Sequence, residues 1–152
     1  MESEILKNIH PALRIAWDEM GDYGKPASEE DIQALLAVFP DTPLDYLDIA
    51  RQLEIVSLNT VSDFQSSFQF FLLSPADILG WLEWYPHLQE QRPGAFFFAN
   101  DGDTAFLVAE HGGQRGVFKV ETSVPDWNYA KYLAPSIREL LCGGVGWAEE
   151  NS

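Results

Sequence analysis

Cysteine, cationic residues and long hydrophobic runs are scarce in this sequence, and each scarcity excludes a class of protein. Cys142 is the only cysteine, so the chain can form no internal disulfide and is not a disulfide-stapled secreted domain. No run approaches the roughly 18 apolar residues that a membrane span needs. The start, MESEILKNIH, lacks the basic and apolar regions of a signal peptide. We therefore expect a soluble cytoplasmic protein.

Lysine and arginine number 9 against 24 aspartate and glutamate, which gives a formal net charge of -15. Nucleic acid and anionic membranes would repel such a chain, so we expect neither as a partner. Spread evenly over a surface of about 7,800 Å², this charge would place only about one or two net negative charges under a binding patch of about 800 Å². Attraction of a basic partner therefore requires the acidic residues to cluster.

The motifs of common enzyme classes are also missing. The sequence has no GxxxxGK[ST] or GxGxxG phosphate loop, no GxSxG elbow and no HExxH pair. His10, His87 and His111 are not spaced as the three or four ligands of a zinc site. Cys142 has no base near it in the sequence that would make it a nucleophile. We therefore predict no catalytic residue, no cofactor and no metal.

The stretch Asn100-Asp101-Gly102-Asp103 has two interpretations. Asp101 and Asp103, together with Glu110, would suit a metal site or a catalytic carboxylate pair. The same residue types are standard in a turn between two strands. An EF-hand loop would need a glutamate at its twelfth position, where Gly112 stands. We favour the turn.

Two capped amphipathic helices are predicted after residue 27. Ser28 is placed to cap the first, and Pro40 ends it. Thr42 is expected to cap the second, with Pro43 as its first residue. Their apolar residues recur at the spacing of one buried helix face: Ile32, Leu35, Leu36 and Phe39 in the first, and Tyr46, Ile49, Ala50 and Leu53 in the second.

The segment before these helices has apolar residues at steps of three and four over residues 1–20, which predicts a helix. Pro11 would kink that helix or move its start to His10. We therefore expect a helical extension over residues 1–26, a domain over residues 27–145 and a tail over residues 146–152.

The remainder of the domain predicts an α+β fold with one mainly antiparallel sheet and helices before and after it. Five segments have the pattern of strands: residues 53–59, 67–73, 95–99, 104–110 and 116–121. A helix over residues 75–85 begins at Ser74-Pro75, and short turns join the last three strands as antiparallel neighbours. An irregular loop over residues 122–132 leads to a last helix after Pro135, which Gly143-Gly144 end.

Aromatic residues exceed what these elements need for packing. In the helix over residues 75–85, Leu79 and Leu82 suffice to pack one face. Trp81 and Trp84 then indicate either a deeply buried helix or a patch that faces a partner, and we leave both open. The loop over residues 122–132 carries either an aromatic plug over the sheet edge or further contacts. The candidate partner-binding residues are Trp81, Trp84, Asp101, Asp103, Asp126, Trp127 and Tyr129.

Four stretches stand in an order and spacing that resemble the SUKH superfamily, which includes bacterial immunity proteins and a fungal regulator of cell-wall synthesis. They are SEEDIQALLAVFPDTPLDYLDIARQ (28–52), FFFANDGDTAFLVA (96–109), GVFKVE (116–121) and YLAPSIRELL (132–141). Two features depart from the family pattern. The stretch Arg51 to Ile55 lacks the Asn-Gly turn that usually follows the second helix, and residues 1–26 have no counterpart.

The resemblance implies a bacterial immunity protein that is not an enzyme and that binds and neutralises a cognate toxin, often a nuclease. The acidic surplus suits a basic toxin domain as the partner. We expect a monomer or a weak homodimer. The family has no catalytic residues to carry over, and its partner contacts cannot be transferred by position. The alternatives are a scaffold or regulator in cell-envelope or signalling assembly, and a metal-dependent hydrolase.

Overall fold

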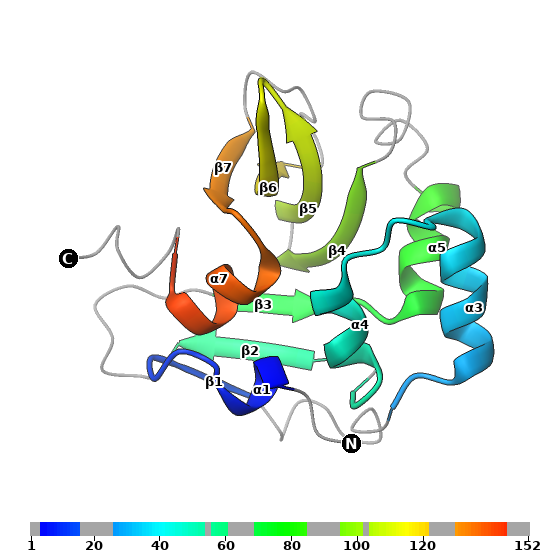
Figure 1. The fold of residues 1–152 in the computed structure, drawn as a ribbon, viewed down its shortest axis with the longest axis horizontal. Coiled ribbons are helices and arrows are strands. Elements are labelled where there is room, and N and C mark those ends of the chain that lie inside the picture. The colour runs from blue at the N-terminus through cyan, green and yellow to red at the C-terminus, as the bar shows by residue number, and fades with distance from the viewer. Residues whose placement is uncertain are drawn as a thin grey trace.

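The computed structural model describes residues 4–15, 26–53, 56–60, 69–84, 95–101, 104–121 and 130–145. Their strands form one seven-stranded sheet in which every strand pairs antiparallel with the next one along the chain. Figure 1 shows the sheet curling strongly, so that β2 and β3 run across the direction of β5, β6 and β7. The α+β class and the mainly antiparallel sheet predicted from the sequence are confirmed.

The strands are β1 (Leu13–Ile15), β2 (Val56–Thr60), β3 (Gln69–Leu72), β4 (Phe96–Asp101), β5 (Thr104–His111), β6 (Gln114–Glu121) and β7 (Lys131–Ala134). The helices are α1 (Glu4–Lys7), α3 (Glu29–Val38), α4 (Leu44–Ala50), α5 (Pro75–Trp84) and α7 (Ile137–Gly143). In the part of the chain that the structure describes, no helix has the length and apolar character to cross a membrane.

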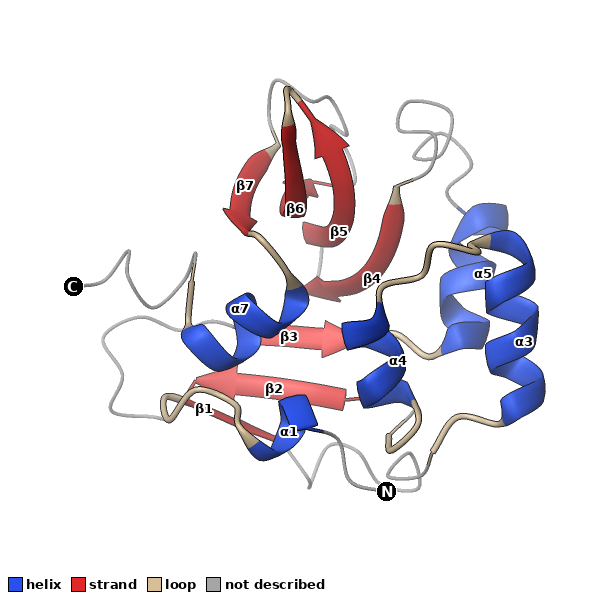
Figure 2. Cartoon of the chain, in the orientation of Figure 1, coloured by secondary structure: helices blue, strands red, loops and turns tan. Residues whose placement is uncertain are grey.

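The helices form two groups around the sheet (Figure 2). The first group is α1, α4 and α7, which contact one another, and α7 also contacts β6 and β7. The second group is α3 and α5, which pack side by side near the ends of β3 and β4. The curl of the sheet and these two groups enclose one hydrophobic core.

Aromatic rings from the middle of the sheet fill this core. Phe70 of β3 packs against Phe98 and Phe106, with ring centroids 5.6 Å and 4.6 Å apart. The first four residues of β4 are buried, and the pairing of the strand with β5 shifts by one residue between Phe97 and Ala99. Such a bulge bends a strand, and Figure 1 shows β4 as the curved strand that joins the two halves of the sheet.

Helix starts follow the predicted caps with one correction. Ser28 accepts a hydrogen bond from the Asp31 amide at 3.1 Å, and Ser74 accepts one from the Asp77 amide at 3.1 Å, so both predicted caps are confirmed. Thr42 does not cap α4. Its hydroxyl instead donates to the carbonyl oxygen of Phe39 at 2.6 Å, and Pro43 takes the N-cap position without a side-chain bond.

The predicted helix over residues 1–20 is wrong for residues 13–15. α1 is a single turn, and Leu13 to Ile15 then form β1, which pairs with Leu58 to Thr60 of β2. Ile5, Leu6 and Leu13 are buried in the same core as the rest of the chain. Residues 4–15 therefore contribute one helical turn and an edge strand to the sheet.

A second correction concerns the predicted loop over residues 122–132. Lys131 and Tyr132 belong to β7, which pairs with β6 through Val117 to Lys119. The pairing shifts at Val117 and Phe118, and Gly116 lies where the β7 backbone approaches closely. β7 then leads into α7, where Ser136 accepts a hydrogen bond from the Glu139 amide and Gly144 ends the helix with a φ of 71°.

Candidate functional site

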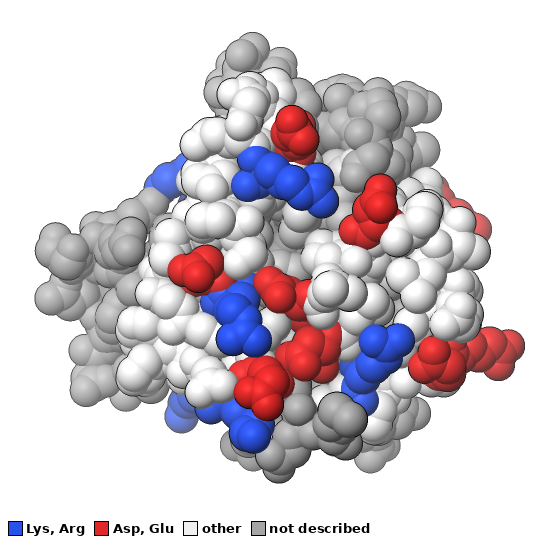
Figure 3. Space-filling model, in the orientation of Figure 1, with Lys and Arg blue, Asp and Glu red and all other residues white. Residues whose placement is uncertain are grey.

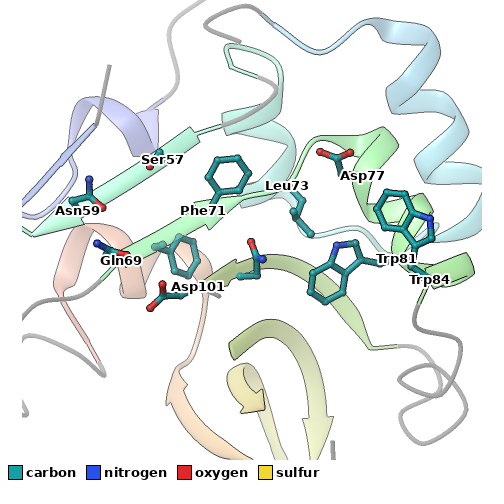
Figure 4. Close-up of a pocket in the computed structure, with 11 residues that line it drawn as sticks. Ser57, Asn59, Gln69, Phe71, Leu73, Asp77, Trp81, Trp84 and Asp101 are labelled. Atoms are coloured by element: carbon teal, nitrogen blue, oxygen red, sulfur yellow. The ribbon is translucent and has the colours of Figure 1, made fainter. Parts of the chain in front are cut away.

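A hollow of about 500 Å³ lies between the polar face of β2, β3 and β4 and the helix α5. Cross-strand pairing brings Ser57, Phe71 and Asn100 into one row across these three strands. Alternate residues such as Leu58 and Phe70 are buried, with Phe70 packed among the core rings. We call this hollow the β3–α5 groove, and Figure 4 shows its lining side chains.

Helix α5 forms one wall of the groove because its start is fixed at the end of β3. The helix begins at Pro75, three residues after the last residue of β3, and Ser74 caps it. Asp77, Trp81 and Trp84 follow at i, i+4 and i+7, the spacing that places side chains on one helix face. The lining therefore includes a carboxylate and two indoles from a single helix (Figure 4).

The two tryptophans of α5 have opposite roles. Trp81 has 9% of its surface exposed and stacks on Phe97, with ring centroids 6.2 Å apart and an interplanar angle of 26°. Trp84 has 65% of its surface exposed. The helix is therefore anchored by one indole and exposes the other.

The strand wall of the groove is made of amides and one exposed ring. Asn59 pairs with Gln69 beside the row that contains Phe71, whose surface is 38% exposed. Among the described residues, the large apolar side chains with substantial exposure are Val38, Leu44, Phe71 and Trp84. Two of these four line the groove, so it concentrates the apolar surface that this part of the chain leaves uncovered.

Among the described residues, two carboxylates and no cation line the groove. Asp77 lies on α5, and Asp101 lies at the end of β4. Within the described segments, no ion pair involves either carboxylate. A cationic group of a partner would therefore find uncompensated negative charge beside exposed aromatic rings.

The helix side of the molecule differs from the groove in its charge pattern. Figure 3 shows acidic and basic side chains interspersed over α1, α4 and α7. Glu29 and Arg51 form an ion pair at 4.0 Å, and the Asp45 carboxylate accepts a hydrogen bond from the Arg138 amide at 3.0 Å. Acidic and basic side chains therefore lie close to one another on this face, and a backbone amide satisfies the Asp45 carboxylate.

Of the seven candidate contacts from the sequence, the structure brings Trp81, Trp84 and Asp101 to one groove. Asp103, Asp126, Trp127 and Tyr129 lie outside the described residues. Sequence reasoning missed the strand residues of the groove: Asn59, Gln69, Phe71 and Asn100. The sequence signal that could have found them is the alternation of side chains between the two faces of a strand, which leaves Phe71 as the single apolar residue on the outer face of β3.

Asp101 and Glu110, the two described carboxylates of the possible metal or hydrolytic set, are not brought together. Asp101 pairs with Thr104 at one end of the β4–β5 hairpin, as the turn interpretation predicts, whereas Glu110 pairs with Arg115 at the other end of β5. Glu110 lies six positions along the strand from Thr104, which is about 20 Å, so Glu110 cannot share an ion with Asp101. In the described ranges, no three His, Cys, Asp or Glu side chains gather in a metal-binding arrangement.

The single thiol lies away from the groove. The Cys142 thiol donates a weak hydrogen bond to the carbonyl oxygen of Ile5 at 3.5 Å. Burial raises the pKa of Cys142, the nearby Arg138 opposes this shift, and Asp45 and Glu139 add to it. The thiol therefore stays protonated near neutral pH, which is the unreactive form.

The chain matches no family model, and it matches no curated protein. The resemblance to the SUKH superfamily accordingly stays a prediction from the sequence stretches quoted above.

Proposed function

We propose that this protein is a non-enzymatic protein-binding domain, an immunity-type protein that neutralises a toxin by docking on a basic domain of it. The observation that supports this proposal is the β3–α5 groove, where the exposed rings of Phe71 and Trp84 lie in the same lining as the carboxylates of Asp77 and Asp101. The order of the SUKH-like stretches in the sequence supports it independently.

The groove combines the two kinds of group that a protein interface uses. Exposed tryptophans are frequent anchors of binding energy because they bury a large surface with few rotatable bonds. Uncompensated carboxylates chiefly raise the association rate of a basic partner and select against acidic ones. A toxin domain that binds nucleic acid has a basic surface of the matching sign.

The test is co-expression with basic toxin domains encoded beside the gene of this protein. We expect the full chain to restore growth of a host that expresses the cognate toxin and to co-purify with that toxin. A non-cognate toxin of similar charge is the matched control. If attraction by charge alone were sufficient, the protein would neutralise both toxins. If no neighbouring toxin is bound or neutralised, the proposal is wrong. Recovery of a housekeeping assembly protein instead would favour the scaffold alternative.

Salt dependence separates attraction by charge from contact alone. With the groove carboxylates in place, raising the ionic strength from low to physiological values lowers the association rate, because screening shortens the range of the field. The dissociation rate changes much less, because aromatic packing controls it. An association rate that is independent of salt would refute the electrostatic part of the proposal.

A further inference from the structure

The ring of Trp84 lies beside Gly80, one turn earlier on α5, and stays largely exposed. Ring carbons Cη2 and Cζ3 of Trp84 lie 3.4 Å from the position that a Cβ on Gly80 would occupy. The indole therefore leans back along α5 by one turn, while 65% of the residue stays exposed. The exposed part of the ring is available for a planar group to stack on it.

The lean of the ring brings it close to a carboxylate. Asp77 precedes Gly80 by three residues, which is a rise of about 4.5 Å along a helix. Figure 4 shows the Trp84 ring extending from the end of α5 back toward Asp77. A cation seated on the ring would thus lie within reach of a negative charge on the same helix face.

From this geometry we propose that the β3–α5 groove binds an arginine side chain of the partner, with its guanidinium stacked on Trp84 and paired with Asp77. The proposal rests on the proposed function and specifies the partner chemistry at that site. Guanidinium is planar, weakly hydrated and forked, so it can stack on an indole and donate two parallel hydrogen bonds to a carboxylate. Lysine offers the charge without the plane.

The strand wall indicates what lies beside that arginine. Phe71 faces the same hollow with 38% of its surface exposed, and Asn100 next to it offers an amide donor and acceptor. A volume of about 500 Å³ exceeds what one side chain fills and suits a short peptide segment. The expected ligand is therefore an extended segment in which an apolar residue neighbours the arginine.

The other ligand class that suits rings and amides is a neutral saccharide, whose apolar face also stacks on indoles. The groove favours the arginine because a neutral ligand would leave Asp77 and Asp101 without a compensating charge. A sugar-binding result is nevertheless a defined outcome of the test.

The test titrates the full chain with three synthetic peptides, acetyl-Gly-Leu-Arg-Leu-Gly-amide and the same sequence with citrulline or lysine at the centre. Citrulline keeps the shape of arginine and removes its charge. Calorimetry gives the affinities, and the indole N–H resonances in ¹⁵N spectra report contact, with the Trp84 signal assigned from Trp84→Phe. We expect the arginine peptide to bind about tenfold or more tightly than the citrulline peptide, with lysine between them.

Variants identify the residues responsible. Trp84→Ala and Asp77→Asn should each weaken binding of the arginine peptide about fivefold or more. Glu83→Gln is the matched control, because Glu83 is exposed on α5 outside the groove lining and its loss should change nothing. Trp84 and Asp77 are not core residues, so thermal melts should confirm that the variants fold.

Three results would overturn the proposal: equal affinity for the arginine and citrulline peptides, binding that neither variant weakens, or a neutral glucose hexasaccharide that shifts the Trp84 signal when the arginine peptide does not. The outcome is separable from the proposed function. If the Trp84→Ala and Asp77→Asn variants still neutralise the toxin, the arginine site alone is refuted. If the protein binds the arginine peptide but no cognate toxin exists, the immunity function alone is refuted.

Discussion

The Tyr46 hydroxyl donates a hydrogen bond to the carbonyl oxygen of Leu73 at 2.7 Å, and this buried contact ties α4 to the end of β3. The amide of Leu73 donates to the carbonyl oxygen of Phe98 at 2.9 Å, so both backbone groups of this residue are engaged. The side chain of Leu73 lines the β3–α5 groove, and α5 begins two residues later. Helix α4, on the core side, thus fixes the position from which α5, one wall of the groove, begins.

Replacing Tyr46 by phenylalanine should therefore destabilise the fold. The ring would keep its edge contact with Phe96, whose centroid lies 5.3 Å away, but the Leu73 carbonyl would lose its partner in a buried setting. Such a loss costs about 1–3 kcal/mol. Urea unfolding measures it, and Tyr132→Phe on the half-buried β7 position is the control with an expected change below about 0.5 kcal/mol. Equal unfolding free energies for Tyr46→Phe and wild type would contradict the assignment.

Gly116 should tolerate no side chain. A Cβ there would collide with the carbonyl oxygen of Ala134 and stand 3.1 Å from the Pro135 Cα, both backbone atoms that cannot rotate away. Gly116→Ala should lower the unfolding free energy by about 3 kcal/mol or more, since β6 and β7 must separate.

Gly80→Ala is the matched control for that substitution. A methyl group on α5 would meet only ring atoms of Trp84 at 3.4 Å, an ordinary contact. Alanine is also the better helix former, so stability should stay unchanged or rise by up to about 1 kcal/mol. If both glycine variants melt like the wild type, the close approach of β7 to β6 at Gly116 is wrong.

Cys142 should react slowly with alkylating reagents until the pH is high. Desolvation by burial raises its pKa, with Arg138 opposing and Asp45 and Glu139 reinforcing the shift. Because the folded protein holds this proton more tightly than the unfolded chain, the related stability is present below the unfolded pKa and is lost as the pH rises through the folded pKa. Rates of iodoacetamide labelling against pH should show a midpoint above that of glutathione or of the unfolded chain in urea. A midpoint at or below either reference would disprove the shift.

Local signals in the sequence account for most of the helices. Ser28 and Ser74 cap helices where predicted, and the stripe that includes Ile32 and Leu35 is buried. The prediction that Thr42 caps α4 was wrong because a hydroxyl two residues before a helix can donate to a carbonyl of the preceding turn as readily as it can cap the helix that follows.

The elements that sequence reasoning missed are those made by distant partners. Leu13 to Ile15 form a strand because β2 offers an edge to pair with, although their apolar spacing is typical of a helix. Lys131 and Tyr132 become β7 through pairing with Lys119 and Phe118. Neither partner can be inferred from local periodicity.

The groove could be predicted only in part for the same reason. Trp81 and Trp84 have similar sequence surroundings, and their different exposure depends on Phe97 beneath one ring and Gly80 beside the other. The contribution of Phe71 follows only once β3 is known to lie beside α5.

The most direct measurement is a chemical-shift map of the ¹⁵N-labelled chain on addition of the basic toxin domain encoded beside its gene. The account predicts that the largest changes fall on the groove residues Phe71, Trp84 and Asn100. Leu44, whose side chain is 80% exposed on α4 outside the groove, should shift little. Changes concentrated on α4 and α7 with the Trp84 indole signal unmoved would contradict it.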